Sequence, residues 1–236
     1  LSKGKEVLPF VESAESTQQE DGLIKGRLAL LKEGLQQTDV KEALADWMDL
    51  GGADLWQGGQ LGHSALDPTW NVAESMERFE ALRKEIWLEM NEEQTALEQV
   101  RILNHVFFSL RSMESARRLP HVPMEALPSG VLQQKKGNPI GLGVLYLAVA
   151  RALDIPLRGV NLPNHFILAY CDVAHVNEPE VTKGQSGILF YINPYSQGSV
   201  IGVDEVSEFL LEVGEGESVQ HWRPSHPMEI IQRLVR

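Results

Sequence analysis

The chain has 236 residues, of which 43% are hydrophobic and 23% are charged, as expected of a globular protein with a substantial core. Its 33 acidic residues outnumber its 21 basic ones, and the net charge of −12 argues against a nucleic-acid-binding surface. The single cysteine, Cys171, excludes an internal disulfide and a cysteine-based metal cage. No apolar run approaches the roughly 20 residues needed to cross a bilayer, so no membrane partner is expected.

Residues 1–95 are predicted to form a helical amino-terminal extension that packs on the rest of the chain. Apolar residues recur every three or four positions in residues 23–35, 40–50 and 76–90, which is the pattern of amphipathic helices. The glycine-rich stretch 51–68 predicts a long loop between two of these helices. It has neither the preceding strand nor the following Lys-Ser/Thr of a phosphate-binding loop.

The second half of the sequence predicts a buried helix followed by strands. Asn138-Pro139 has the form of a helix N-cap followed by proline in the first helical position, and residues 140–153 are apolar nearly all round. Short β-like runs and a closing helix follow at residues 157–162, 165–170, 188–192 and 203–211. Helices first and antiparallel strands after them predict an α+β protein, with its core in residues 96–236.

Four blocks in this half carry a family resemblance. They are Gly137 to Leu142, Leu145 to Leu153, Gly159 to Phe166 and Tyr191 to Pro194. In this order they resemble the transglutaminase-like superfamily, specifically its bacterial SirB-type branch. The resemblance implies a papain-like core, in which a buried central helix packs on a small antiparallel sheet.

The resemblance also implies where a catalytic site would lie. Active family members carry a Cys at the start of the buried helix, a His on one strand and an Asp on the next. In this sequence Pro139 stands at the Cys position, His165 matches the His and Asn193 matches the Asp. Proline has no nucleophile, so the acyl-enzyme route is closed here. Cys171 lies six residues beyond His165 on one predicted strand, about 20 Å away at roughly 3.3 Å per residue. It is therefore too far from His165 to replace the missing nucleophile.

Polar residues at the ends of the predicted elements would surround this position under the family topology. They are Asn138, Asn161, Asn164 and Tyr195, and their convergence suits a peptide or amide-bearing ligand. Taken singly, each asparagine is also explained as a cap or turn residue. No metal site and no cofactor are expected.

Three functional hypotheses follow. The first is a cytoplasmic, non-catalytic transglutaminase-like protein (a pseudoenzyme) that binds a peptide or protein ligand. The second is a hydrolase or amidase in which His165 acts as general base and Asn193 orients it, against the alternative that His165 is only structural. The third is an interaction module whose acidic helices bind a basic partner, because residues 1–100 hold nine basic and 20 acidic residues.

Overall fold

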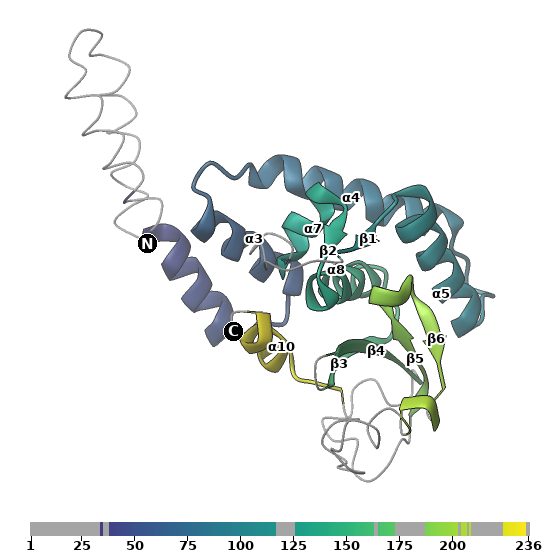
Figure 1. Cartoon of the computed structure of the whole chain (residues 1–236). Coiled ribbons are helices and arrows are strands. Elements are labelled where there is room, and N and C mark those ends of the chain that lie inside the picture. Colours follow the sequence, from purple (N-terminus) through teal and green to yellow (C-terminus); the bar gives the residue numbers. More distant parts are fainter. Residues whose placement is uncertain are drawn as a thin grey trace, which may run out of the picture.

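The computed structural model describes Gly34, residues 38–116, 126–162, 165–172, 187–202 and 204–206, Glu208 and residues 224–234. A central helix, α8, lies between a layer of helices on one side and a four-stranded sheet on the other (Figure 1). This arrangement confirms the predicted α+β fold with a buried helix packed on a small antiparallel sheet. None of the described helices combines the length and the apolar character that a membrane span requires.

Helix α8 (Pro139–Arg151) begins where the sequence predicts. The Asn138 side chain accepts a hydrogen bond from the Gly141 backbone N–H at 2.7 Å, and Pro139 fills the first turn, where a missing N–H is harmless. Every residue from Gly141 to Ala150 is buried. A helix that is apolar on all sides needs packing partners on all sides, which the helical layer and the sheet supply.

The sheet consists of four antiparallel strands that neighbour one another in chain order. They are β3 (Leu157–Leu162), β4 (His165–Cys171), β5 (Ile188–Asn193) and β6 (Ser199–Ile201). The first three confirm the predicted strands, and β6 was not predicted. Side chains alternate between the faces: Phe166 and Leu168 join the apolar cluster around α8, whereas Ile167 and Ala169 join a second cluster on the far face. The sheet is therefore apolar on both faces.

Helices that precede α8 in sequence form the opposite layer. They are α3 (Leu55–Leu66), α4 (Val72–Glu89), α5 (Ala96–Asn104), a π-helix at His105–Leu110 and α7 (Pro128–Gln134), and residues 38–49 are also helical. A short parallel pair, β1 (Glu114–Ser115) and β2 (Lys136–Gly137), lies among them. Leu55, Trp56 and Phe79 share one apolar cluster with α8, so α3 and α4 pack on the same core.

The prediction of a loop across the glycine-rich stretch is wrong for most of its length, because Leu55–Leu66 forms α3. The glycines mark the points where this helix approaches its neighbours. A Cβ on Gly58 would stand 2.3 Å from the ring of Trp47, and a Cβ on Gly59 would stand 2.3 Å from Pro128. Tertiary packing that needs glycine thus outweighs the helix propensity that glycine lacks.

The carboxy-terminal segment covers the free edge of the sheet along β3. The Ser225 backbone N–H donates to the Gly159 carbonyl at 2.7 Å. Helix α10 (Pro227–Leu234) follows, and its Arg233 donates to the Leu162 carbonyl at 2.8 Å. These contacts satisfy backbone groups that an edge strand would otherwise leave exposed.

Some predicted elements fall outside the described residues. Of the predicted helix at residues 23–35 only Gly34 is described, and it is helical. Of the predicted helix at residues 203–211, residues 204–206 and Glu208 are described, and they are helical.

The Gly143→Ala variant tests the contact between α8 and the sheet. A Cβ on Gly143 would stand 2.3 Å from Cδ1 of Phe166. We expect the free energy of unfolding to fall by about 1–3 kcal/mol in urea denaturation, as for other overpacked cores, even though alanine raises helix propensity. The control is Gly202→Ala, where nothing lies within 4 Å of the added Cβ. Equal stability of the two variants would contradict the close contact.

Candidate functional site

The start of α8 is the position that the family resemblance assigns to the nucleophile. Pro139 is half-buried there, and its pyrrolidine ring offers neither a nucleophilic atom nor a backbone N–H. The side-chain oxygen of Asn138 is committed to the Gly141 N–H, so this predicted binding residue serves as the helix cap. The arrangement stabilises the helix start and supplies no group for covalent chemistry.

His165 and Asn193 lie on the same face of the sheet. His165 is the first residue of β4, is exposed, and pairs with Leu162, the last residue of β3. Its neighbour Phe166 is buried toward α8, as is Ile192 beside Asn193. Because side chains alternate along strands, His165 and Asn193 both project from the face opposite α8. The structure thus brings the two predicted residues to one side of the sheet, and that side faces away from the body of α8.

The Asn193 side chain caps a short 3₁₀ helix, Pro194–Ser196. Its oxygen accepts hydrogen bonds from the backbone N–H groups of Tyr195 at 3.1 Å and Ser196 at 3.3 Å. A carboxamide oxygen has two lone pairs, and these two bonds use both. An Asn193 oxygen that oriented an imidazole N–H would have to give up part of this cap.

Asn161 and Tyr195, which the sequence analysis placed in the same binding site, also have partners in the fold. The Asn161 oxygen accepts from Arg233 on α10 at 3.4 Å. The Tyr195 hydroxyl donates to the Ala116 carbonyl at 2.9 Å, which ties the 3₁₀ helix to the strand pair β1–β2. Asn164 lies outside the described residues. Convergence of all these residues around one ligand stays a prediction.

Cys171 ends β4 and is buried in the apolar cluster on the far face of the sheet. Burial raises the pKa of its thiol, and the nearby Arg158 opposes this shift only in part. A buried thiol with a raised pKa is a poor nucleophile, because the thiolate is the reactive form.

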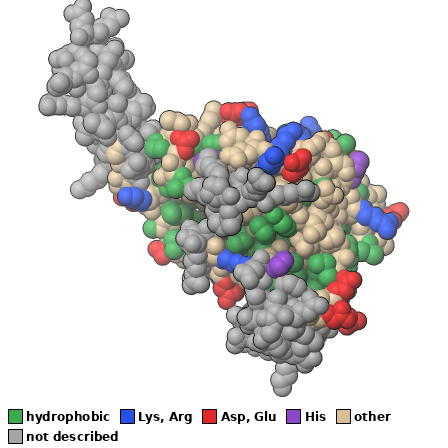
Figure 2. Space-filling model, in the orientation of Figure 1, with side chains coloured by type: hydrophobic (Ala, Val, Ile, Leu, Met, Phe, Trp, Pro, Cys, Tyr) green, Lys and Arg blue, Asp and Glu red, His purple; other side chains and the backbone are tan. Residues whose placement is uncertain are grey.

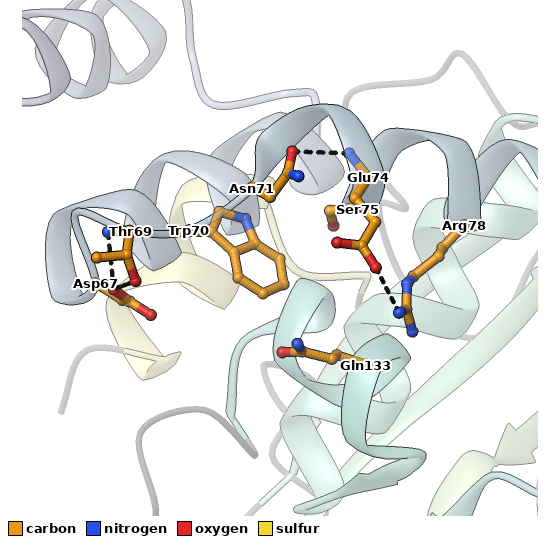
Figure 3. A pocket seen from close by; sticks show the side chains of 8 residues that line it. All are labelled: Asp67, Thr69, Trp70, Asn71, Glu74, Ser75, Arg78 and Gln133. Atoms are coloured by element: carbon orange, nitrogen blue, oxygen red, sulfur yellow. Dashed lines mark hydrogen bonds and ion pairs between the residues drawn. The ribbon is translucent and has the colours of Figure 1, made fainter.

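A second candidate site lies on the helical layer, between the α3–α4 connection, the first turns of α4 and α7. It is a cavity of about 240 Å³, and we call it the Trp70 pocket. Figure 3 shows the Trp70 indole in its centre, with Asp67 and Thr69 on one side and Glu74, Arg78 and Gln133 on the other. The lining residues are Asp67, Thr69, Trp70, Asn71, Glu74, Ser75, Arg78 and Gln133.

A chain of buried polar groups lies behind Trp70. The indole N–H donates to the Gln60 side-chain oxygen at 2.7 Å, and the Gln60 amide donates to the Ser75 hydroxyl at 2.6 Å. The ring of His63 stacks on the indole with centroids 3.4 Å apart and an angle of 12° between the planes. The Trp70 side chain is therefore held both at its edge and on one face.

His63 is fully buried, and one of its ring nitrogens lacks a partner. Its Nδ1 lies 2.9 Å from the Ser129 hydroxyl, whereas no described group hydrogen-bonds Nε2. Ser129 also donates to the Gly59 carbonyl at 3.2 Å, and in that arrangement Nδ1 carries the imidazole proton. Desolvation lowers the pKa of His63 to about 4, with Asp67 opposing the shift, so the ring is neutral near pH 7.

The pocket is not predicted from the sequence, because the glycine-rich stretch predicts a loop where α3 forms. Two local signals were present. Asp54 and Asn71 each cap the helix that follows by accepting the N–H three residues on, from Gln57 and Glu74. Recognising these caps would have placed helices on both sides of Trp70.

The acid stability of the fold should depend on His63. The unfolded chain binds a proton on this residue near pH 6.5, but the folded chain binds it only near pH 4. Stability contributed by the neutral ring should therefore fall as the pH drops from 6.5 to 4, by up to roughly 3 kcal/mol at about 1.4 kcal/mol per pKa unit.

Urea denaturation between pH 4 and 7 checks this prediction. His63→Phe keeps an aromatic ring against Trp70 and should show a shallower loss of stability in acid than the wild type. The control is His105→Phe, because His105 is exposed. If the free energy of unfolding depends on pH equally in His63→Phe and in the wild type, the acid loss of stability does not come from His63.

Comparisons with known proteins agree with the fold. Residues 73–236 match the Transglutaminase-like superfamily. A UPF0162 protein of Pseudomonas aeruginosa is 27% identical over 177 residues, which cover 72% of this chain and 57% of that protein. A UPF0162 protein of Xylella fastidiosa (strain Temecula1) is 44% identical over 120 residues, 48% of this chain and 38% of that protein.

F-box only protein 21 of Mus musculus is 27% identical over 133 residues, which cover 56% of this chain and 20% of that protein. The chain thus spans between a fifth and three fifths of the length of these relatives. No solved structure matches the sequence. The superfamily match begins inside α4 and includes α8 and the whole sheet. The chain therefore belongs to the transglutaminase-like superfamily.

Proposed function

We propose that this chain is a non-catalytic member of the SirB-type branch of the superfamily and that it acts by binding a peptide or protein ligand. The observation that carries the proposal is Pro139 in the first turn of α8, capped by Asn138. An acyl-transfer enzyme needs a thiolate at this position, and a helix N-terminus is where its charge would be stabilised. With proline in this position, the helix N-terminus has no thiolate to stabilise.

The other candidate residues also support binding over acyl transfer. Cys171 is buried, and its raised thiol pKa disfavours the thiolate. The Asn193 oxygen is engaged in capping. His165 is exposed and pairs with Leu162, whose carbonyl accepts a hydrogen bond from Arg233. Figure 2 shows hydrophobic side chains around the middle of the face, and such surface suits a protein or peptide ligand.

One observation favours the hydrolase or amidase hypothesis as a second candidate. His165 is exposed, as a general base that activates water must be. This mechanism needs no cysteine, so Pro139 does not argue against it. The two candidates differ in whether hydrolysis that depends on His165 can be measured.

The acidic amino-terminal region supports the third hypothesis, an interaction module. Residues 1–100 hold nine basic and 20 acidic residues, whereas residues 101–236 hold 12 and 13. A partner with a basic surface would be attracted to this half of the chain.

An activity probe tests the non-catalytic proposal. Native protein treated with iodoacetamide should stay unlabelled, because its one cysteine is buried, and should become labelled on unfolding in urea. It should also hydrolyse p-nitrophenyl acetate no faster than the His165→Ala variant. Labelling or hydrolysis that His165→Ala abolishes would overturn the proposal, and hydrolysis without labelling would support the second candidate.

The Pro139→Cys variant, made together with Cys171→Ser, tests the position itself. A thiol at the start of α8 should have a pKa below the ordinary value of about 8.5, because the helix N-terminus favours the thiolate. The rate of its reaction with iodoacetamide as a function of pH gives this pKa. Ser199→Cys in the same background is the control, on an exposed strand position. Equal pKa values for the two thiols would argue against a former nucleophile position at Pro139.

A further inference from the structure

We propose that the Trp70 pocket binds a guanidinium group, carried by an arginine side chain of a peptide. The pocket lies between α4 and α7 on the helical layer, whereas Pro139, His165 and Asn193 lie at the start of α8 and on the sheet. The inference therefore stands apart from the role proposed for the sheet side of the molecule.

The orientation of the Trp70 indole is fixed by its neighbours. One face of Trp70 is covered by His63 at a centroid distance of 3.4 Å, and the ring N–H is held by Gln60 at 2.7 Å. Trp70 is half-buried and lines the cavity, and in Figure 3 its ring lies between the other lining side chains. Indole attracts a cation more strongly than the other aromatic rings, because of the charge distribution over its face. A ring that is already held in place also loses no side-chain freedom when the ligand stacks.

Acidic side chains flank the indole ring of Trp70. Asp67 and Glu74 lie on opposite sides of the indole (Figure 3). Hydrogen bonds from the Thr69 hydroxyl and N–H lower the pKa of Asp67, so this carboxyl is ionised near neutral pH. Both bonds go to Oδ1, and among the described residues no cation pairs with Asp67. Its second oxygen is therefore available to a ligand.

Arg78 also lines the pocket, but its charge is matched within it. Its guanidinium donates to the Glu74 carboxylate at 2.6 Å. The two carboxylates and one guanidinium of the lining leave one negative charge, which belongs to Asp67. The pocket thus favours a cation over an anion, and the net charge of −12 on the whole chain acts in the same direction.

The shape of the pocket favours guanidinium over a compact ammonium group. A guanidinium is planar, stacks flat on an indole and directs N–H groups from its edge toward a carboxylate. Gln133 supplies a further amide oxygen across the pocket from Asp67. The volume of about 240 Å³ exceeds that of several water molecules at about 30 Å³ each, which leaves room for the alkyl stem.

Isothermal titration calorimetry with four small probes tests the proposal. N-acetylarginine amide should bind, and its neutral isostere N-acetylcitrulline amide should bind about 2- to 30-fold more weakly, the range expected from a cation on an indole face. N-acetyllysine amide should bind more weakly than the arginine probe. N-acetylglutamate should not bind. Equal affinity for the arginine and citrulline probes, or binding of the glutamate probe alone, would overturn the assignment.

Two variants locate the binding. Asp67→Asn keeps an oxygen that can accept from Thr69 but removes the negative charge, so the affinity for the arginine probe should fall several-fold. Trp70→Phe should lower this affinity as well, because phenylalanine offers a smaller aromatic face. The control is Asp49→Asn, an exposed carboxylate outside the pocket, which should bind as the wild type does. Unchanged affinity in Asp67→Asn would overturn the proposal even if Trp70→Phe fails to fold.

Discussion

The burial of α8 is the constraint on which the rest of the fold depends. Its residues from Gly141 to Ala150 are all inaccessible, so no side of the helix tolerates water. Helices must cover one side and a sheet the other, and both coverings need close approach. Gly143 permits it against Phe166 on the sheet. One apolar segment thus dictates a three-layer order that no single neighbouring element could stabilise alone.

The start of the same helix shows how Asn138 and Pro139 support the fold. Asn138 and Pro139 are among the best residues for starting a helix, because the cap satisfies a backbone N–H and proline needs none. In this chain the two residues serve the stability of the central helix. The surrounding polar residues follow this pattern, since Asn161, Asn193 and Tyr195 each hold an element in place.

Local sequence signals predicted α8 and three of the four strands, because the cap, the apolar run and the turns are encoded next to one another. They did not predict α3, whose glycines act through contacts with Trp47 and Pro128 from distant segments. The Trp70 pocket was hidden for the same reason: His63 meets Ser129, 66 residues further along the chain. The candidate residues His165 and Asn193 lie on β4 and β5. Which face each side chain occupies required the sheet register.

The segment around Ser225 has a consequence for solubility. The Ser225 backbone N–H donates to the Gly159 carbonyl and so occupies part of the edge of β3, and α10 contacts the same strand. Proteolytic removal of this segment would leave β3 with unpaired backbone groups beside apolar side chains. Such an edge recruits strands from other molecules. Residues 225–234 therefore cover this edge and also extend the core through Ile230.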